Sequence, residues 1–505
     1  MTNLATLLTT SAGTHADRVM VKLDDAQLTY AQVHHLSACF AGQLRRAGVS
    51  DGDRVAIILP NVPHVPVIYN AILRLGAIVV PLNPLLTERE VAYHLEDSQA
   101  VAVVVWEAMA VTAEAAAGDR TVITLEAGSL QGMGEQEPAQ DVADKDEDDV
   151  AVLLYTSGTT GRPKGAMLTH RNMRTNAELV VELFSITPED VLFGGLPFFH
   201  VFGQTVAMNA VAAAGASVTL LGRFEPVKAV DVLKRDAVTL VAAVPSMHIA
   251  MVQEAVKRKA EEFPHIRGLI SGGSPLPVEV LRRAEKVFDA VVLEGYGLSE
   301  TSPVVCFNQF GGPRAAGSIG TPVRGADLRV VDAMGEEVPY GEVGEIAISG
   351  QYVMAGYWRK EEATAQAIRD GWLQSGDLGR QDDDGLFYIV DRMKDMIIRG
   401  GYNVYPREVE EVIFEFQGVS ECAVIGVPDD RLGQEVAAVV AFVEQPEDPG
   451  AVITQLDEHV RAQLANYKVP RVWQIVEALP KGPTGKILKR TIEVGEDAVR
   501  TGSNA

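Results

Sequence analysis

At 505 residues the chain is too long for one hydrophobic core, which rarely grows beyond about 250 to 300 residues, so two or more domains are expected. Its 44 Lys and Arg residues against 68 Asp and Glu residues give a formal net charge of −24. This charge argues against a nucleic-acid surface or a polybasic membrane anchor, since both need clustered positive charge, and it indicates small-molecule partners.

Cysteine usage and the apolar segments indicate a cytoplasmic protein with no integral membrane segment. Cys39, Cys306 and Cys422 lack metal-site spacing, and a sparse, odd count is typical of a reducing compartment, so we expect three buried thiols. Residues 1–16 contain no Lys or Arg and therefore lack the positive start of a secretory signal. Residues 206–221 are interrupted by polar residues and are shorter than the ~20 residues of a membrane span, so a buried helix followed by a strand is predicted.

Helices and strands are expected to alternate over the first hundred residues. The apolar spacing predicts helices over residues 28–47, 65–75 and 88–95, and strands over residues 55–59, 78–81 and 101–105. This alternation predicts a doubly wound α/β layer, because parallel strands need a helical crossover each time. Residues 135–149 hold eight acidic residues and one lysine, so this segment is expected to be a solvated connection.

The most informative stretch follows an apolar run over residues 150–154 and reads Tyr-Thr-Ser-Gly-Thr-Thr-Gly-Arg-Pro-Lys-Gly, residues 155–165. Its glycines and proline disfavour regular structure, while its hydroxyls, free backbone N–H groups and Lys164 suit an anion. It differs from the nucleotide-binding loop that has four residues between its glycines and ends in Gly-Lys-Ser/Thr. A simple hairpin turn needs only one or two such residues, so the pattern predicts a phosphate cradle.

This stretch resembles the phosphate-binding signature of the adenylate-forming superfamily, which includes acyl-CoA synthetases, aryl-CoA ligases, luciferases and amino-acid adenylation domains. Motifs described below extend the resemblance from about residue 25 to about residue 490. The resemblance implies an α/β fold: a large N-terminal domain of doubly wound mixed α/β layers with a strand-rich subdomain, and a small α+β C-terminal domain. It also implies that the loop residues that bind ATP are Thr156, Ser157, Gly158, Thr159, Thr160 and Lys164.

The segment Leu-Pro-Phe-Phe-His-Val-Phe-Gly, residues 196–203, concerns the acid substrate. By composition alone, a histidine among aromatic residues is more often packed in a core than catalytic. The resemblance instead implies that His200 lies beside the acyl carboxylate, where amino-acid adenylation domains place an Asp for the ammonium group. An apolar acid is therefore expected, in a pocket of apolar or small residues: Val201, Phe202, Gly273, Gly295, Gly297, Pro303 and Val304.

Two further segments, residues 267–276 and 291–301, read as strands that run into turns rich in small residues. The resemblance implies that they enclose the adenine through Gly272, Gly273, Glu294, Gly295 and Tyr296. It places Ser299 near the α-phosphate and assigns Mg²⁺ to Glu300. That assignment suits a hard cation, which takes one or two carboxylates together with phosphate oxygens, although taken alone Glu300 reads as a surface residue after a turn.

The second half of the chain supplies the remaining motifs. Strands over residues 327–331 and 344–349 predict a second subdomain of antiparallel character. Asp377 matches the family aspartate that accepts from both ribose hydroxyls, although alone it reads as a turn residue. The resemblance further implies that Arg392 reaches the ribose or a phosphate and that Lys394 is the pivot of a hinge.

The expected domains are therefore an N-terminal adenylation domain over residues 1–391, a hinge over 392–394, a mobile C-terminal domain over 395–490 and a disordered tail over 491–505. Lys486, in Pro-Thr-Gly-Lys, matches the family's adenylation lysine, although composition alone suggests a solvated lysine before a short helix. Gly400 and Gly401 are expected to face the pantetheine tunnel of coenzyme A.

The resemblance implies an ATP-dependent acyl-CoA synthetase that forms an acyl-adenylate and pyrophosphate and then replaces AMP with the thiol of CoA. Carboxylate and α-phosphate are both anions, so the site must supply positive charge, and the expected catalytic residues are Lys486, His200 and Glu300. The expected cofactors are ATP, Mg²⁺ and coenzyme A, and the oligomeric state stays open, with a homodimer considered. A medium- or long-chain fatty acid is the expected substrate. The alternatives are an aryl-CoA ligase of the 4-coumarate type, an enzyme that loads an acyl carrier protein, a luciferase-type oxygenase and a non-enzymatic nucleotide-binding module.

Overall fold

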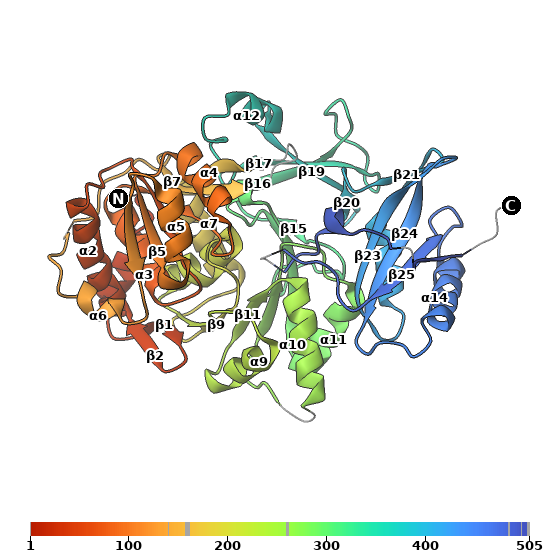
Figure 1. Ribbon diagram of the computed structural model, residues 1–505, viewed down its shortest axis with the longest axis horizontal. Coiled ribbons are helices and arrows are strands. Elements are labelled where there is room, and N and C mark those ends of the chain that lie inside the picture. The colour runs from red at the N-terminus through yellow and green to blue at the C-terminus, as the bar shows by residue number, and fades with distance from the viewer. Residues whose placement is uncertain are drawn as a thin grey trace.

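The computed structural model describes residues 2–139, 141–156, 162–258, 262–482, 485–495 and 497–501. These residues form four sheets in two bodies (Figure 1). We call the body up to strand β20 the large domain and the body from strand β21 onward the small domain. Among the described residues, no helix combines the length and the apolar character that a membrane crossing requires.

One six-stranded sheet of the large domain has the order β6-β5-β3-β4-β7-β8. Its strands are β3 (Arg54–Ile58), β4 (Ile78–Pro81), β5 (Ala102–Trp106), β6 (Thr121–Leu125), β7 (Val150–Thr156) and β8 (Lys164–Thr169). All neighbours pair in parallel except β7 and β8, which are antiparallel. Ala56 and Ile58 pack on one face with helices α4 and α5, whereas Val55 and Ile57 pack on the other face with α2 and α3, as the two-residue period of a strand requires. The predicted doubly wound layer is confirmed.

The helices of this half are α1 (Thr6–Thr14), α2 (Tyr30–Arg46), α3 (His64–Arg74), α4 (Glu88–Ser98), η1 (Glu107–Met109), α5 (Ala110–Ala117), α6 (Ser129–Met133) and α7 (His170–Leu183). The helix predicted over residues 28–47 begins two residues later. Thr29 caps it, because its hydroxyl accepts from the Gln32 backbone N–H while the Gln32 side chain accepts from the Thr29 N–H.

A nine-stranded sheet has the order β15-β14-β13-β12-β11-β9-β10-β1-β2. Its strands are β1 (Val19–Leu23), β2 (Ala26–Thr29), β9 (Val191–Gly194), β10 (Ser217–Leu220), β11 (Leu240–Ala243), β12 (Gly268–Ser271), β13 (Val291–Tyr296), β14 (Cys306–Phe307) and β15 (Thr321–Pro322). Its helices are the π-helix η2 (Gly203–Asn209), α8 (Ala210–Ala214), α9 (Pro226–Arg235), α10 (Pro245–Lys257), α11 (Val278–Phe288) and η3 (Ser299–Thr301). The strands from β10 to β13 are parallel, so their carboxyl ends meet at one edge.

A third, antiparallel sheet confirms the predicted strand-rich subdomain. It contains β16 (Ala326–Val331), β17 (Gly344–Gly350), β18 (Ile368–Arg369), β19 (Trp372–Gln381) and β20 (Phe387–Arg392), with helix α12 (Glu361–Ala367) beside it. The predicted hinge over residues 392–394 covers the end of β20 and the turn that follows.

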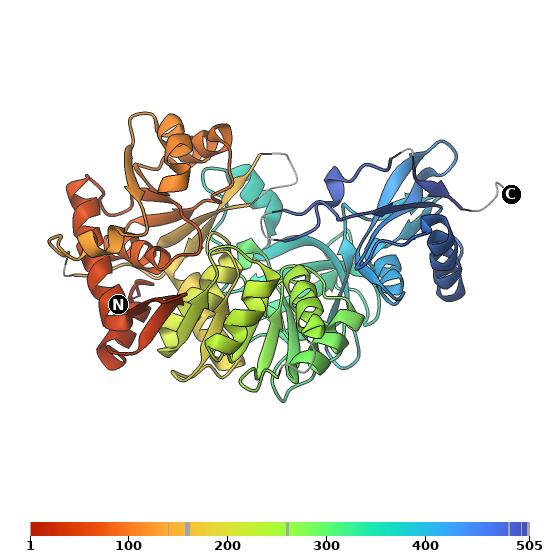
Figure 2. The ribbon, with the colours of Figure 1, turned by 60° about the horizontal axis from the view of Figure 1, so that its bottom comes forward.

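The small domain has its own core around the buried Trp473. It contains β21 (Ile397–Arg399), β22 (Tyr402–Val404), α13 (Pro406–Phe414), β23 (Val419–Asp429), β24 (Gly433–Phe442), α14 (Pro449–Gln463), β25 (Val472–Val476), η4 (Lys489–Thr491) and β26 (Val499–Arg500). Figures 1 and 2 show this domain in blue at one end of the molecule, with a dark blue segment extending from it to the large domain.

The expectation of a disordered tail over residues 491–505 is wrong for the described residues 497–501. Strand β26 pairs with β25, with Val499 opposite Trp473, and the Thr501 hydroxyl donates to Asp457 Oδ1 at 2.7 Å. The edge of β25 has unpaired backbone N–H and C=O groups, and residues 497–501 can pair with them although their side chains are mostly polar. The predicted buried thiols are confirmed, because Cys39, Cys306 and Cys422 are all buried and unpaired.

Candidate active site

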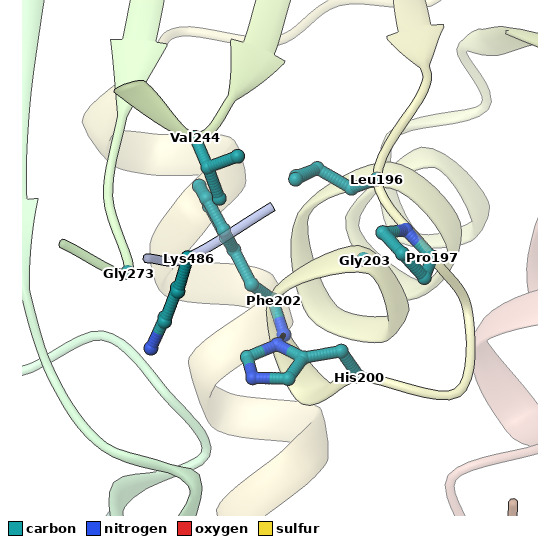
Figure 3. Close-up of a pocket in the computed structure, with 8 residues that line it drawn as sticks. All are labelled: Leu196, Pro197, His200, Phe202, Gly203, Val244, Gly273 and Lys486. Atoms are coloured by element: carbon teal, nitrogen blue, oxygen red, sulfur yellow. Dashed lines mark hydrogen bonds between the residues drawn. The ribbon is translucent and has the colours of Figure 1, made fainter. Parts of the chain in front are cut away.

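A small cavity lies where the edge of the nine-stranded sheet meets the small domain (Figure 3). Its volume is about 10 Å³, room for about one water molecule. It is lined by Leu196, Pro197, His200, Phe202, Gly203, Val244, Gly273 and Lys486. The cavity therefore joins the histidine segment, the first adenine turn and the lysine motif, which are far apart in the sequence. Figure 3 shows the Lys486 ammonium and the His200 ring at the same end of this group.

Lys486 enters the large domain beside Gly273. The φ of Gly273, +85°, is a conformation that favours glycine, and a Cβ there would lie in van der Waals contact with Lys486 Cε at 3.5 Å. Burial lowers the pKa of Lys486 to about 8, with Arg392 adding to the shift and the charges of Asp377 and Glu300 opposing it. The Lys486 ammonium is therefore a cation at neutral pH that burial has partly desolvated.

His200 is held as a neutral imidazole. Burial lowers its pKa to about 3, and the nearby charge of Lys486 adds to the shift. Its Nδ1 accepts from the backbone N–H of Phe202 at 3.3 Å, so a neutral ring carries its proton on Nε2. His200 can thus donate one hydrogen bond without adding a charge to the cavity.

Asn61, which the sequence analysis missed, holds the loop that precedes His200. Its side chain accepts from the Phe198 N–H at 2.9 Å and donates to the carbonyls of Leu196 at 2.6 Å and Gly194 at 3.2 Å. The contact joins residues 137 positions apart, so no local pattern could have predicted it. The π-helix η2 begins three residues after His200, and such segments often occur at functional sites.

The predicted ribose residues come together across two sheets. Tyr296, at the end of β13, donates from its hydroxyl to Asp377 Oδ2 at 2.7 Å, and Arg392 Nε lies 3.2 Å from Asp377 Oδ1. Asp377 and Arg392 are register partners on β19 and β20, which fixes their separation through the backbone. Asp377 is only 5% exposed, and the contacts with Tyr296 and Arg392 fix the position of its carboxylate.

The adenine turn is tied to its neighbouring strand by Glu294. Glu294 Oε1 accepts from the Leu276 N–H at 3.0 Å. Burial raises the pKa of Glu294 to about 7, and the charge of Arg407 opposes that shift. Gly295 has no room for a side chain, because a Cβ there would lie 1.9 Å from the Phe307 ring, whereas a Cβ at Gly272 would lie 3.4 Å from Phe202.

The predicted phosphate loop is described at its two ends. Thr156 and Lys164 are register partners on β7 and β8, whereas Ser157, Gly158, Thr159 and Thr160 lie outside the described residues. The Thr156 hydroxyl donates to Glu300 Oε1 at 3.1 Å, and Glu300 follows Ser299 in the short helix η3. The entry to the loop and the predicted metal carboxylate are therefore in direct contact.

The assignment of Mg²⁺ to Glu300 stays a prediction. No group of three or more His, Cys, Asp or Glu side chains that could hold a metal occurs in the described ranges. Mg²⁺ needs only one or two carboxylates when phosphates and waters supply its other ligands.

The remaining predicted residues lie in different places. Phe202 lines the cavity, while Val201, Pro303 and Val304 are buried but are not among its lining residues. A Cβ at Gly297 would lie 1.5 Å from the Pro303 carbonyl oxygen, so this glycine permits a close backbone contact. Lys394, Gly400 and Gly401 are exposed, the two glycines forming the tip of the β21–β22 hairpin away from the cavity. The acyl and CoA assignments stay predictions.

Comparisons with known proteins show which family the chain resembles. The family model described as AMP-binding enzyme matches residues 8–358, and the model for the AMP-binding enzyme C-terminal domain matches residues 408–486. The chain is 36% identical to a long-chain-fatty-acid–CoA ligase of Bacillus subtilis over 97% of this chain and 94% of that protein. It is 39% identical to a feruloyl-CoA synthase of Amycolatopsis over 92% of each chain. It superimposes on the ATP-bound crystal structure of MatB from Rhodopseudomonas palustris with a TM-score of 0.88 and 34% identity, covering 96% and 97% of the two chains.

The chain therefore belongs to the AMP-binding enzyme family, the adenylate-forming superfamily whose motifs it carries, and has the acyl-CoA synthetase-like fold. Within that class it is an AMP-forming acid–CoA ligase.

Proposed function

We propose that this ligase activates an apolar carboxylic acid, most simply a medium- or long-chain fatty acid, as an acyl-adenylate and transfers it to coenzyme A. The observation that carries the proposal is the cavity in which Lys486 of the small domain meets His200 of the large domain. Apart from these two residues, its lining consists of apolar side chains and glycines. A hydrocarbon next to such a wall loses contact with water at no electrostatic cost.

In the first half-reaction, the acid's carboxylate attacks the α-phosphate of ATP and pyrophosphate leaves. Two anions must approach, so preorganised positive charge and hydrogen-bond donors lower the barrier. The Lys486 ammonium supplies the charge at the α-phosphate, and the His200 Nε2–H group donates to the carboxylate. A neutral histidine suits this role, because a second cation would disfavour the protonated form of Lys486.

The nucleotide is held by groups that do not take part in bond making. Asp377 accepts from the ribose hydroxyls, which replace part of its present contacts with the Tyr296 hydroxyl and the Arg392 guanidinium. The turns around Gly272 and Tyr296 enclose the adenine. Glu300 supplies the protein ligand for Mg²⁺, which when bound would neutralise phosphate charge and orient the pyrophosphate as it leaves.

In the second half-reaction, the CoA thiol attacks the acyl carbonyl and AMP leaves. The Gly400–Gly401 hairpin tip is exposed, and Lys394 lies in the connection between the two domains. We propose that the small domain rotates about Lys394, withdrawing Lys486 and bringing the glycine tip to the pantetheine path. Assembly of a site by domain movement is a common form of gating in enzymes.

The second candidate substrate is an aryl acid, favoured by the 39% identity to a protein named feruloyl-CoA synthase. An apolar wall suits a flat ring as well as an alkyl chain, so the lining residues do not distinguish the two substrates. Transfer to an acyl carrier protein in place of CoA is the third possibility.

A panel of acids tests the proposal through two readouts, pyrophosphate release and thioester formation with ATP, Mg²⁺ and CoA. Octanoate and dodecanoate should turn over faster than malonate, glycine and alanine. A faster reaction with ferulate would replace the fatty acid with an aryl acid. If malonate, glycine and alanine all exceeded octanoate and dodecanoate, the apolar pocket assignment would be wrong.

A further inference from the structure

We propose that Tyr357 is a positioning residue for the pyrophosphate end of the site, because it holds both the carboxylate of Glu300 and the ammonium of Lys164 in place before the nucleotide arrives. The proposal rests on the roles given above to those two residues and adds the residue that orients them. Tyr357 lies between β17 and α12, outside every motif that identified the site.

The hydroxyl of Tyr357 fixes Glu300. It donates to Glu300 Oε1 at 2.9 Å, and the Thr156 hydroxyl donates to the same oxygen at 3.1 Å. Two neutral donors on one oxygen set the rotation of the carboxylate and leave its charge in place. Glu300 is thereby presented in one orientation, and a metal ion need not fix it on binding.

The ring of Tyr357 holds Lys164. The Lys164 ammonium lies 4.7 Å from the centre of the ring, within the range of a cation–π contact. Such a contact uses the charge of the ammonium but none of its N–H donors in a strong hydrogen bond. The lysine at the exit of the phosphate loop is therefore kept close while its donors are available to phosphate oxygens.

Tyr357 is itself fixed by its backbone. Its segment pairs with the exit strand of the loop through an antiparallel bridge between Ala166 and Tyr357, and the Tyr357 N–H donates to Thr364 Oγ1 at 2.8 Å. On the same segment the Met354 N–H donates to the Glu300 carbonyl at 2.8 Å. The stretch from Met354 to Tyr357 therefore connects strand β8 to the short helix η3 that carries Glu300.

The contact between Tyr357 and Glu300 is shielded from water. Tyr357 is only 9% exposed, so its hydroxyl donates to the Glu300 carboxylate in a buried setting.

Substitution of Tyr357 by Phe and by Leu separates the two contacts. Tyr357→Phe keeps the ring and loses the hydroxyl, whereas Tyr357→Leu loses both. The readout is ATP affinity measured by calorimetry across a Mg²⁺ titration, without acid or CoA. Tyr357→Phe should raise the Mg²⁺ concentration for half-maximal ATP affinity about 5- to 10-fold, as expected for a lost hydrogen bond to a charged group, and saturating Mg²⁺ should restore the affinity. Tyr357→Leu should also weaken ATP binding at saturating Mg²⁺ about 2- to 5-fold.

Tyr352→Phe is the matched control. Tyr352 is a buried tyrosine five residues earlier whose hydroxyl donates to the Arg324 carbonyl at 2.6 Å, so its loss removes a comparable bond that does not involve Glu300. Its Mg²⁺ curve should coincide with that of the unsubstituted protein. The proposal is overturned if Tyr357→Phe also leaves the curve unchanged, or if it weakens ATP binding equally at every Mg²⁺ concentration. A failed acid panel with an intact Mg²⁺ shift would contradict the proposed substrate alone.

Discussion

The large and small domains supply the candidate active site in different ways. The large domain presents Asp377, Arg392 and Tyr296 from paired or neighbouring strands, already in contact with one another. The small domain contributes Lys486, which comes from a short segment beyond its own core and enters a cavity lined otherwise by the large domain. The large domain therefore suits groups that are needed in both proposed half-reactions. The separate small domain suits a group that is needed in only one of them.

Among changes to the large domain, the largest effect is expected from removal of the Asp377 carboxylate, which we propose binds the ribose. Asp377→Ala should lower both half-reactions by about 10²- to 10³-fold, because two hydrogen bonds between ribose and a charged group are lost. The measurement is pyrophosphate release without CoA, compared with thioester formation from supplied acyl-adenylate. A loss confined to one half-reaction would mean that Asp377 does not hold the nucleotide throughout.

Restriction of the connection between the domains should affect only the second half-reaction. Lys394→Pro fixes φ near −65° and restricts the preceding residue, so rotation is impeded while the arrangement described here is kept. Thioester formation should fall about 10-fold or more while acyl-adenylate accumulates on the enzyme. Lys394→Ala, which does not restrict the backbone, is the control. An equal loss of both half-reactions in the proline variant would contradict the hinge assignment.

The titration of Lys486 gives the smallest expected change. Its pKa is lowered to about 8, so the ammonium is present below that pH and is lost as the pH rises through it. Pyrophosphate release without CoA should therefore fall about tenfold between pH 8 and about pH 9.3, since half of the lysine is charged at the pKa and the cation fraction drops by roughly a factor of ten per unit well above it. Lys486→Arg stays charged throughout, so its slower reaction should show no such fall. A shared fall in both proteins would assign the titration to another group.

The sequence predicted the parts of this molecule that depend on local patterns. The alternation between residues 54 and 106 predicted the parallel layer because each strand and helix carries its own period. The predicted site residues Lys486, His200 and Gly273 meet at one cavity, although they come from separate motifs. The π-helix was read only as a buried helix, since its apolar composition does not distinguish it from an α-helix.

The supporting contacts could not be predicted in the same way. Tyr357 and Glu300 are 57 residues apart, and Asn61 and Phe198 are 137 apart, so neither pair leaves a signal in any window of sequence. Strand β26 was missed because its local sequence gives a signal that points to the wrong structure. Its local composition indicates disorder, and only the free edge of β25 makes it a strand.

The two half-reactions of Lys486→Ala test the central claim most directly, because Lys486 is the small-domain residue that we propose to act at the α-phosphate. Pyrophosphate release without CoA should fall about 10²- to 10³-fold, as the loss of one preorganised charge-stabilising donor typically causes. Thioester formation from supplied acyl-adenylate should be nearly unchanged, because the proposed rotation of the small domain withdraws Lys486 before that step. If both steps fall to the same extent, Lys486 is structural or shared, and the division of labour between the two domains is contradicted.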